Sequence, residues 1–196
     1  EDLTNKGFLN AAISNLIYKY LEENGIKTHL IKELDETSVL VRKAEIVMVE
    51  VIIRNVAAGS FSKKYGVPEG YWLKNTVVEF SLKSDALGDP MINNTQITAL
   101  GIATKAELDE MVQTSLKVNR LLIDLFMRAG IKLIDFKLEF GRSDGEIILC
   151  DEISPDSCRF WEEGTDKKLD KDRFRRDLGD VTESYEEVLK RLKSVI

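Results

Sequence analysis

Apolar residues recur at helical spacing in three parts of the chain and predict three helices. The stripes lie at residues 5–24, at about 104–129 and at 181–195. Thr104 and Glu107 have the spacing of a capping box, in which each side chain hydrogen-bonds the other residue's backbone N–H. The middle helix is therefore expected to begin at this pair.

Other segments show the composition and alternation of strands. The chain between the first two helices is rich in Val and Ile and predicts about three strands, the last and longest at 47–56. Residues 131–153 predict a hairpin, because Ile134, Phe136, Leu138 and Phe140 alternate with Asp135, Lys137 and Glu139. A turn centred near Gly145 would place Glu139 opposite Asp151. Strands interleaved irregularly with helices predict the α+β class.

Composition narrows the possible functions. The 196 residues suit one globular domain or two small lobes, and the net charge of −6 argues against a general nucleic-acid binder. No apolar run approaches the roughly 20 residues of a membrane helix. Cys150 and Cys158 do not form a CxxC pair and are expected to be reduced, partly buried thiols of a cytoplasmic protein. The single histidine, His29, is expected at the surface or as a capping residue.

The charged face of the hairpin has two interpretations. In the simpler one it is a solvated face on which Lys137 neutralises Glu139. In the other, Glu139 and Asp151 bind Mg²⁺ together with nucleotide phosphates, because Mg²⁺ prefers hard oxygen ligands such as carboxylates. Lys137 would then contact a phosphate or a carboxylate. Both carboxylates are expected on rigid strands, which favours the second interpretation.

Two further segments could bind anions. The segment "IIRNVAAGSFSKKYG" delivers Arg54 from a strand and places Ser60 at the start of a short helix, an arrangement suited to phosphate. It could equally be an ordinary strand–turn–helix connection. In "FSLKSDALGDPM", Lys83 and Asp89 lie where a strand opens into a loop, although a capping aspartate explains the carboxylate as well. The run "LDKDRFRR" is expected to be a solvated helix start.

Five motifs occur together in an order and at a spacing that resemble one family. They are "RNVAAGS" (54–60), "LKSDALGDPMIN" (82–93), "DFKLEFG" (135–141), "DEISPDSCRFW" (151–161) and "DKDRFRRDLG" (170–179). With them the chain resembles the SAICAR synthetases, the phosphoribosylaminoimidazole-succinocarboxamide synthases of purine biosynthesis. The resemblance covers essentially all of the chain.

The resemblance implies an ATP-dependent ligase. The family condenses carboxyaminoimidazole ribonucleotide (CAIR) with L-aspartate to give SAICAR, ADP and phosphate, through an acyl phosphate and with Mg²⁺ as cofactor. Its fold has two lobes similar to those of protein kinases, with ATP between them. The expected division is residues 1–50 for the remainder of the ATP-binding lobe and hinge, and 51–196 for the other lobe. A cytoplasmic homodimer without nucleic-acid or membrane partners is also expected.

The resemblance also assigns residues to roles. The expected metal ligands are Glu139 and Asp151. Contacts to ATP are expected from Lys83, Lys137, Glu139, Asp151 and the backbone of Ile46 and Met48. The ribonucleotide is expected at Arg54, Ser60, Asp89 and Arg159. The residues expected to take part in catalysis are Lys137, Asp151 and Asp89.

Two rival functions remain open from sequence. One is a small-molecule kinase of related fold, similar to inositol phosphate kinases, which would transfer the γ-phosphate to a hydroxyl and ignore aspartate. The other is a catalytically incomplete nucleotide-binding fragment. The second is motivated by an N-terminal glycine–lysine loop that family members carry ahead of the segment matching "NKG" and that this sequence lacks. Without that loop the site is expected to lack a lid over the phosphates.

Overall fold

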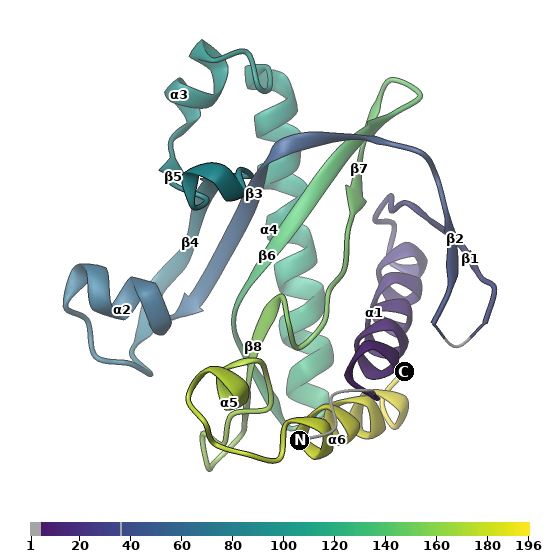
Figure 1. The fold of residues 1–196 in the computed structure, drawn as a ribbon, viewed down its shortest axis with the longest axis vertical. Helices are drawn as coiled ribbons and strands as arrows, with labels where there is room; N and C mark the ends of the chain where they lie inside the picture. The colour runs from purple at the N-terminus through teal and green to yellow at the C-terminus, as the bar shows by residue number, and fades with distance from the viewer. Residues whose placement is uncertain (1–4, 36) are drawn as a thin grey trace.

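The computed structural model describes residues 5–35 and 37–196 and confirms the three expected helices (Figure 1). They are α1 (Lys6–Glu23), α4 (Lys105–Arg128) and α6 (Val181–Lys193). The Thr104–Glu107 capping box is present at the start of α4. Shorter helical segments are α2 (Gly59–Tyr65), η2 (Asp85–Leu87), α3 (Asn94–Ala99) and α5 (Asp172–Arg175).

The strands form two sheets. A two-stranded sheet pairs β1 (Leu30–Glu33) with β2 (Val39–Val41). The larger sheet has the order β5-β4-β3-β6-β7, with β8 also paired to β6. Its strands are β3 (Glu45–Val56), β4 (Trp72–Leu82), β5 (Met91–Ile92), β6 (Ile131–Ser143), β7 (Glu146–Cys150) and β8 (Cys158–Glu162). The α+β prediction is confirmed. The expected boundary between residues 50 and 51 falls inside β3, and the two-lobe division stays a prediction.

Two strands share one edge of β6. β7 pairs with residues 139–143 and β8 with residues 131–136, both antiparallel. Between them the loop 151–157 leaves the sheet, and the backbone N–H of Lys137 donates to the Ser157 carbonyl at 3.0 Å. Pairing along this side of β6 is therefore nearly continuous, and the loop 151–157 leaves the sheet beside Lys137 and Leu138.

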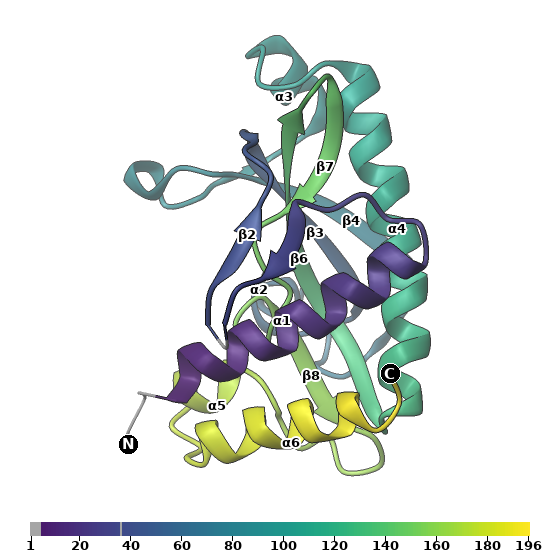
Figure 2. The same ribbon diagram turned by 90° about the vertical axis from the view of Figure 1, so that its right-hand side faces the viewer.

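One face of the larger sheet is covered by α4, which runs along β6 and β3 (Figure 2). Its apolar stripe is buried because leucine, methionine, valine and phenylalanine recur at helical spacing toward the sheet. The helices α1 and α6 pack against each other at one end of the sheet. Among the described residues, no helix combines the length and apolar character needed to cross a membrane.

The hairpin differs from its prediction in two places. Glu139 pairs with Cys150, so the expected pairing of Glu139 with Asp151 is wrong by one residue. A register shift between Leu133 and Asp135 also separates Ile134 from the main core, and Ile134 packs with Val56, Ala58 and Trp161.

Candidate active site

A cluster of acidic and basic side chains occupies the sheet face opposite α4. Glu50 on β3 lies directly across from Glu139 on β6, and both carboxylates are buried. Two lysines compensate this like-charge pair. Lys137 Nζ lies 2.6 Å from Glu50 Oε1 and 3.5 Å from Glu139 Oε1, and Lys83 Nζ lies 2.9 Å from Glu139 Oε1. Together with Asp151 these residues are called the hairpin cluster below.

Asp151 joins the cluster from the end of β7. It follows Cys150 directly, has a left-handed backbone with φ 63° and is exposed. Within residues 5–35 and 37–196, its carboxylate has no hydrogen-bond or ion-pair partner. Burial, followed by the charges of Glu139 and Asp151, raises the pKa of the Cys150 thiol to about 11. Both carboxylates therefore lie near one buried sulfur, although they do not face each other across the hairpin.

The two lysines remain protonated under ordinary conditions. Burial opposes the charge of Lys137, but Glu50, Glu139 and Asp151 outweigh it and raise its pKa. The pKa of Lys83 is raised chiefly by its hydrogen bond to Glu139. The hairpin cluster therefore offers two cations and exposed carboxylate oxygen at one face of the sheet, a combination suited to a metal-bound polyphosphate.

The donor set fits Mg²⁺ in the way that proteins usually bind this ion. One or two carboxylates supply hard oxygens, while substrate phosphates and water supply the rest. Asp151 is exposed and unpaired among the described residues, and Glu139 carries a second carboxylate already oriented by Lys83. Within the same residues, no group of three or more His, Cys, Asp or Glu side chains forms a metal centre made of protein alone. Phosphate oxygens of a bound nucleotide would supply further ligands to such an ion.

Three other residues expected at the nucleotide or substrate site lie around the end of β4. The carbonyl of Met48 accepts a 3.0 Å hydrogen bond from the backbone N–H of Lys83. The pairing of β3 with β6 shifts register between Ile46 and Glu50, and Met48 is exposed there. Asp89 is exposed with φ 48°, and its carboxylate accepts the backbone N–H of Ser84 at 2.8 Å.

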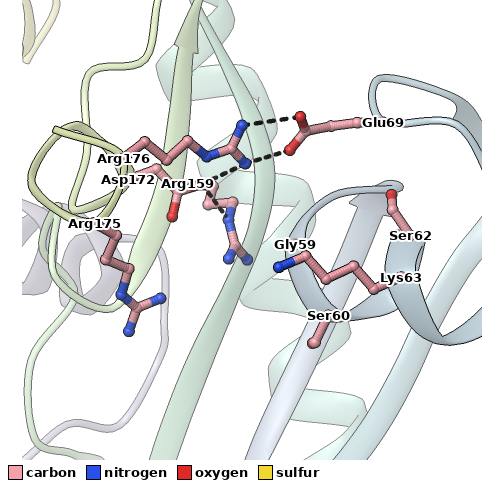
Figure 3. A pocket seen from close by; sticks show the side chains of 9 residues that line it. All are labelled: Gly59, Ser60, Ser62, Lys63, Glu69, Arg159, Asp172, Arg175 and Arg176. Carbon is pink, nitrogen blue, oxygen red and sulfur yellow. Dashed lines mark hydrogen bonds and ion pairs between the residues drawn. The ribbon is translucent and has the colours of Figure 1, made fainter. Parts of the chain in front are cut away.

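A cavity of about 660 Å³ lies at the opposite end of β3 (Figure 3). It is lined by Gly59, Ser60, Ser62, Lys63, Glu69, Arg159, Asp172, Arg175 and Arg176. Four of these side chains are basic and two are acidic. The excess of positive charge makes this space, called the arginine cavity below, suitable for a phosphorylated or carboxylate-bearing ligand.

Arg54 and Arg159 enter this region differently. Arg159 lines the arginine cavity directly, whereas Arg54 is buried behind it. Arg54 donates to Glu79 at 2.6 Å and to Asp135 at 2.9 Å, and it reaches the cavity wall through Ser60 at 3.3 Å. The resemblance places Arg54, Ser60, Asp89 and Arg159 in one site. The structure brings Arg54, Ser60 and Arg159 together, with Arg54 in a supporting position, and places Asp89 apart from them at the end of β4.

Several residues of these two sites are not among those expected from sequence. Glu50 could have been found as the single acid inside the apolar run of β3. Glu69 lies outside the two segments expected to bind anions. Asp172 and Arg176 lie in "LDKDRFRR", which is expected from sequence to be a solvated helix start, whereas Asp172 is buried. Cys150 and Cys158 are buried free thiols, as expected. His29 is half-buried against the ring of Tyr18, with ring centroids 5.4 Å apart.

Comparisons with known proteins agree over nearly the whole chain. The profile of the family described as SAICAR synthetase matches residues 1–192. A phosphoribosylaminoimidazole-succinocarboxamide synthase of Clostridium acetobutylicum is 54% identical over 190 residues, which are 97% of this chain and 81% of that protein. The crystal structure of the synthase of the same description from Ehrlichia chaffeensis superposes with a TM-score of 0.94 at 45% identity, covering 98% of this chain and 82% of the other.

A SAICAR synthetase solved in complex with ADP also superposes with a TM-score of 0.94. It is 46% identical, and the match covers 97% of this chain and 82% of the other. Fold and sequence together define an ATP-dependent ligase. The chain belongs to the SAICAR synthetase family, whose reaction is a step of purine biosynthesis. The resemblance and the ligase activity expected from the sequence motifs are confirmed.

Proposed function

We propose that the hairpin cluster binds the triphosphate of ATP with Mg²⁺, and that the arginine cavity binds CAIR, during condensation of CAIR with L-aspartate. The observation that carries the proposal is the convergence of Lys83 and Lys137 on the Glu139 carboxylate, at 2.9 and 3.5 Å, beside the exposed Asp151. This arrangement supports a site where phosphate charge is neutralised on a rigid face of the sheet.

The chemistry requires an activated carboxylate. A carboxylate oxygen of CAIR attacks the γ-phosphorus of ATP, ADP leaves, and an acyl phosphate forms. The amine of aspartate then attacks the acyl carbon, phosphate leaves, and the nitrogen releases a proton to solvent as the amide bond forms. The protein must align the reacting oxygen and neutralise charge as the phosphoryl group transfers.

The residues of the hairpin cluster divide these tasks. Lys137 and Lys83 supply fixed positive charge near the phosphates, since Glu50 and Glu139 hold both ammonium groups in place. Glu139 and Asp151 would hold Mg²⁺, which neutralises charge on the β- and γ-phosphates when bound. The backbone around Ile46 and Met48, where the pairing of β3 with β6 shifts register, is proposed to contact adenine.

The arginine cavity is assigned to the ribonucleotide for its charge and its lining. Arg159 and Ser60 offer a guanidinium and a hydroxyl to the phosphate, and Arg54 supports them from behind. Asp89, held near the end of β4 by the backbone of Ser84, is proposed to contact the base or the sugar of CAIR.

We also propose a homodimer in the cytoplasm. Tyr65, Tyr71 and Trp72 are about half exposed near α2 and the start of β4, and burial of such aromatic surface stabilises protein interfaces. Light scattering with a Trp72→Ser variant tests the dimer, which is expected to dissociate more readily in the variant.

The compartment and the class of partner are proposed from composition. The two free thiols suit a reducing compartment. The net charge of −6 supports small molecules in preference to nucleic acid as partners.

The release of ADP distinguishes the proposed reaction from its rivals. With CAIR, aspartate and Mg·ATP all present, ADP is expected to form in step with SAICAR, and formation of the product stops when either CAIR or aspartate is omitted. ADP formed with an alcohol acceptor and without aspartate would identify a kinase. Nucleotide binding without ADP release under any condition would identify a non-catalytic protein.

A further inference from the structure

Arg159 is held on two sides while a third side is left open. Its Nε donates to Asp172 Oδ2 at 2.9 Å, and its Nη1 donates to both Asp135 oxygens at 3.0 and 2.9 Å. No hydrogen bond of Nη2 to any other residue in the described part of the chain is found. Nη2 lies against Gly59, and both Gly59 and Arg159 line the arginine cavity. Two carboxylates thus fix the guanidinium plane and leave its remaining N–H groups at the cavity.

Asp172 is the link between two arginines of this cavity. Its side chain is almost fully buried, and it accepts hydrogen bonds from Arg159 Nε at 2.9 Å and from Arg176 Nη2 at 3.2 Å. Its backbone N–H donates to Asp170 at 2.8 Å, which fixes the start of α5. Arg176 also donates to Glu69 with both terminal nitrogens, at 3.0 and 2.5 Å (Figure 3). One carboxylate therefore sets the positions of two guanidinium groups, one on β8 and one directly after α5.

We propose that Asp172 is a positioning residue for binding of the phosphorylated substrate, because it holds Arg159 with an open N–H edge toward the arginine cavity. This inference rests on the proposed assignment of CAIR to that cavity. A guanidinium offers its N–H groups in a rigid fork, so a fixed plane presents a preorganised edge to phosphate. A freely rotating arginine would lose more conformational entropy on binding.

A purely stabilising role for Asp172 explains this geometry less well than a positioning role does. A buried ion pair contributes little net stability, since desolvation of the two charges offsets their attraction. Asp135 and Glu79 together already balance the charges of Arg54 and Arg159, so a further buried carboxylate is not needed to neutralise Arg159. Asp172 adds a fixed orientation, and orientation is what binding of a phosphate requires.

The test compares Asp172→Asn with a matched variant elsewhere. Asp172→Asn is expected to raise the KM for CAIR about tenfold, as loss of a hydrogen bond to a charged group would, and to leave the KM for ATP within about twofold. Glu107→Gln removes another arginine-held carboxylate, since Arg142 Nε donates to Glu107 Oε1 at 2.6 Å outside the cavity lining. It is expected to lower stability without changing the KM for CAIR. Equal changes in both KM values for Asp172→Asn, or none in the KM for CAIR, would overturn the proposal.

A double-mutant cycle separates this inference from the proposed function. Arg159→Ala alone is expected to raise the KM for CAIR, and an unchanged value would reject the assignment of CAIR to the cavity. In the Arg159→Ala background, Asp172→Asn is expected to raise that KM by less than about threefold, because its partner is gone. The same tenfold effect in both backgrounds would mean that Asp172 does not act through Arg159. A normal KM after Asp172→Asn with a raised KM after Arg159→Ala would reject the positioning role alone.

Discussion

At the scale of single residues, the sites depend on backbone conformations that few amino acids adopt readily. The non-glycine residues found with positive φ among the described positions are all aspartates, and they include Asp89 and Asp151. Aspartate tolerates this conformation because its short polar side chain can hydrogen-bond locally. Asp151 thereby turns the chain out of β7 immediately beside the hairpin cluster. Asparagine shares this tolerance, so Asp151→Asn changes the charge with little change to the backbone.

Gly59 is the glycine whose missing side chain matters most for the arginine cavity. Its φ is 53°, and an added Cβ would lie 2.8 Å from Cζ of Arg159. We expect Gly59→Ala to displace the Arg159 guanidinium and to raise the KM for CAIR about tenfold, in addition to a backbone strain of about 1 kcal/mol. Steady-state kinetics and thermal denaturation measure the two effects.

Gly66 provides the matched control for this substitution. It ends the same helix with φ 64°, and an added Cβ would meet no atom within 4 Å. Gly66→Ala should therefore show the strain without the change in KM. A similar KM for the two variants would contradict the role given to the contact between Gly59 and Arg159.

At the scale of elements, local patterns predicted the helices and strands better than their pairing. The capping box of α4 could be predicted because both of its partners lie within four residues of sequence. The register of the β6–β7 hairpin was wrong by one residue, because the turn was expected at Gly145 and is centred between Asp144 and Gly145. Asp144 and Gly145 both have positive φ and form a two-residue turn, which pairs Ser143 with Glu146 and places Glu139 opposite Cys150.

The bulge in β6 could not be predicted from the local alternation of apolar and polar residues either. Leu133 pairs with Phe160 and Asp135 with Arg159, so β6 has one residue more than β8 at this point. Alternation alone places Ile134 with the other apolar residues of the strand. The long-range pairing with β8 decides where its side chain packs.

The capping box of α4 gives an element-scale prediction with a defined pH dependence. Hydrogen bonds from Arg142 and the backbone of Thr104 lower the pKa of Glu107 from 4.5 to about 2. Because the folded-state pKa is depressed, this stabilisation is present above about pH 4.5 and is lost as the pH falls toward 2. Glu107→Gln should lower the free energy of unfolding by about 1 kcal/mol at pH 7.

Urea denaturation at several pH values checks this expectation. The difference between the parent protein and Glu107→Gln should narrow steadily below pH 4.5. Glu110→Gln is the control, since Glu110 is exposed on the same helix and has no ion-pair partner within the described residues. A difference that is the same at pH 3 and pH 7 would argue against the ion pair as the source of the effect.

At the scale of the whole molecule, both sites are assembled from segments far apart in sequence. Glu69 and Arg176 are separated by 107 positions, and Arg54 and Asp135 by 81. The motifs could be recognised one by one, and their family resemblance placed Arg54, Ser60 and Arg159 in one site. Residue types and spacing did not indicate which arginine faces the cavity and which lies behind it, because burial depends on the packing of β3, β4 and β6.

Arg54 therefore links neighbouring strands of the sheet, a structural role that its sequence motif does not indicate. It bridges Glu79 on β4 and Asp135 on β6, and all three side chains are largely buried. Arg54→Ala should lower the free energy of unfolding by about 3 kcal/mol, because it leaves buried carboxylates uncompensated. The sequence alone predicts that the same variant mainly weakens phosphate binding.

Chemical denaturation and calorimetric titration with CAIR decide between these effects. Lys105→Ala is the surface control, since its ion pair with Asp109 is largely exposed and should contribute under about 1 kcal/mol. Unchanged stability together with weakened CAIR binding would show that Arg54 acts as a direct ligand. Lower stability with unchanged affinity in the remaining folded protein would assign it to the framework.

The central claim is that Glu139 and Asp151 bind the metal that accompanies the nucleotide, and calorimetric titration of ADP tests it most directly. Titrations of the parent protein and of Asp151→Asn are compared with Mg²⁺ and with EDTA in its place. Mg²⁺ should strengthen ADP binding to the parent protein about tenfold or more, and this gain should be lost in Asp151→Asn while affinity in EDTA stays unchanged. An equal gain from Mg²⁺ in both proteins would contradict the account.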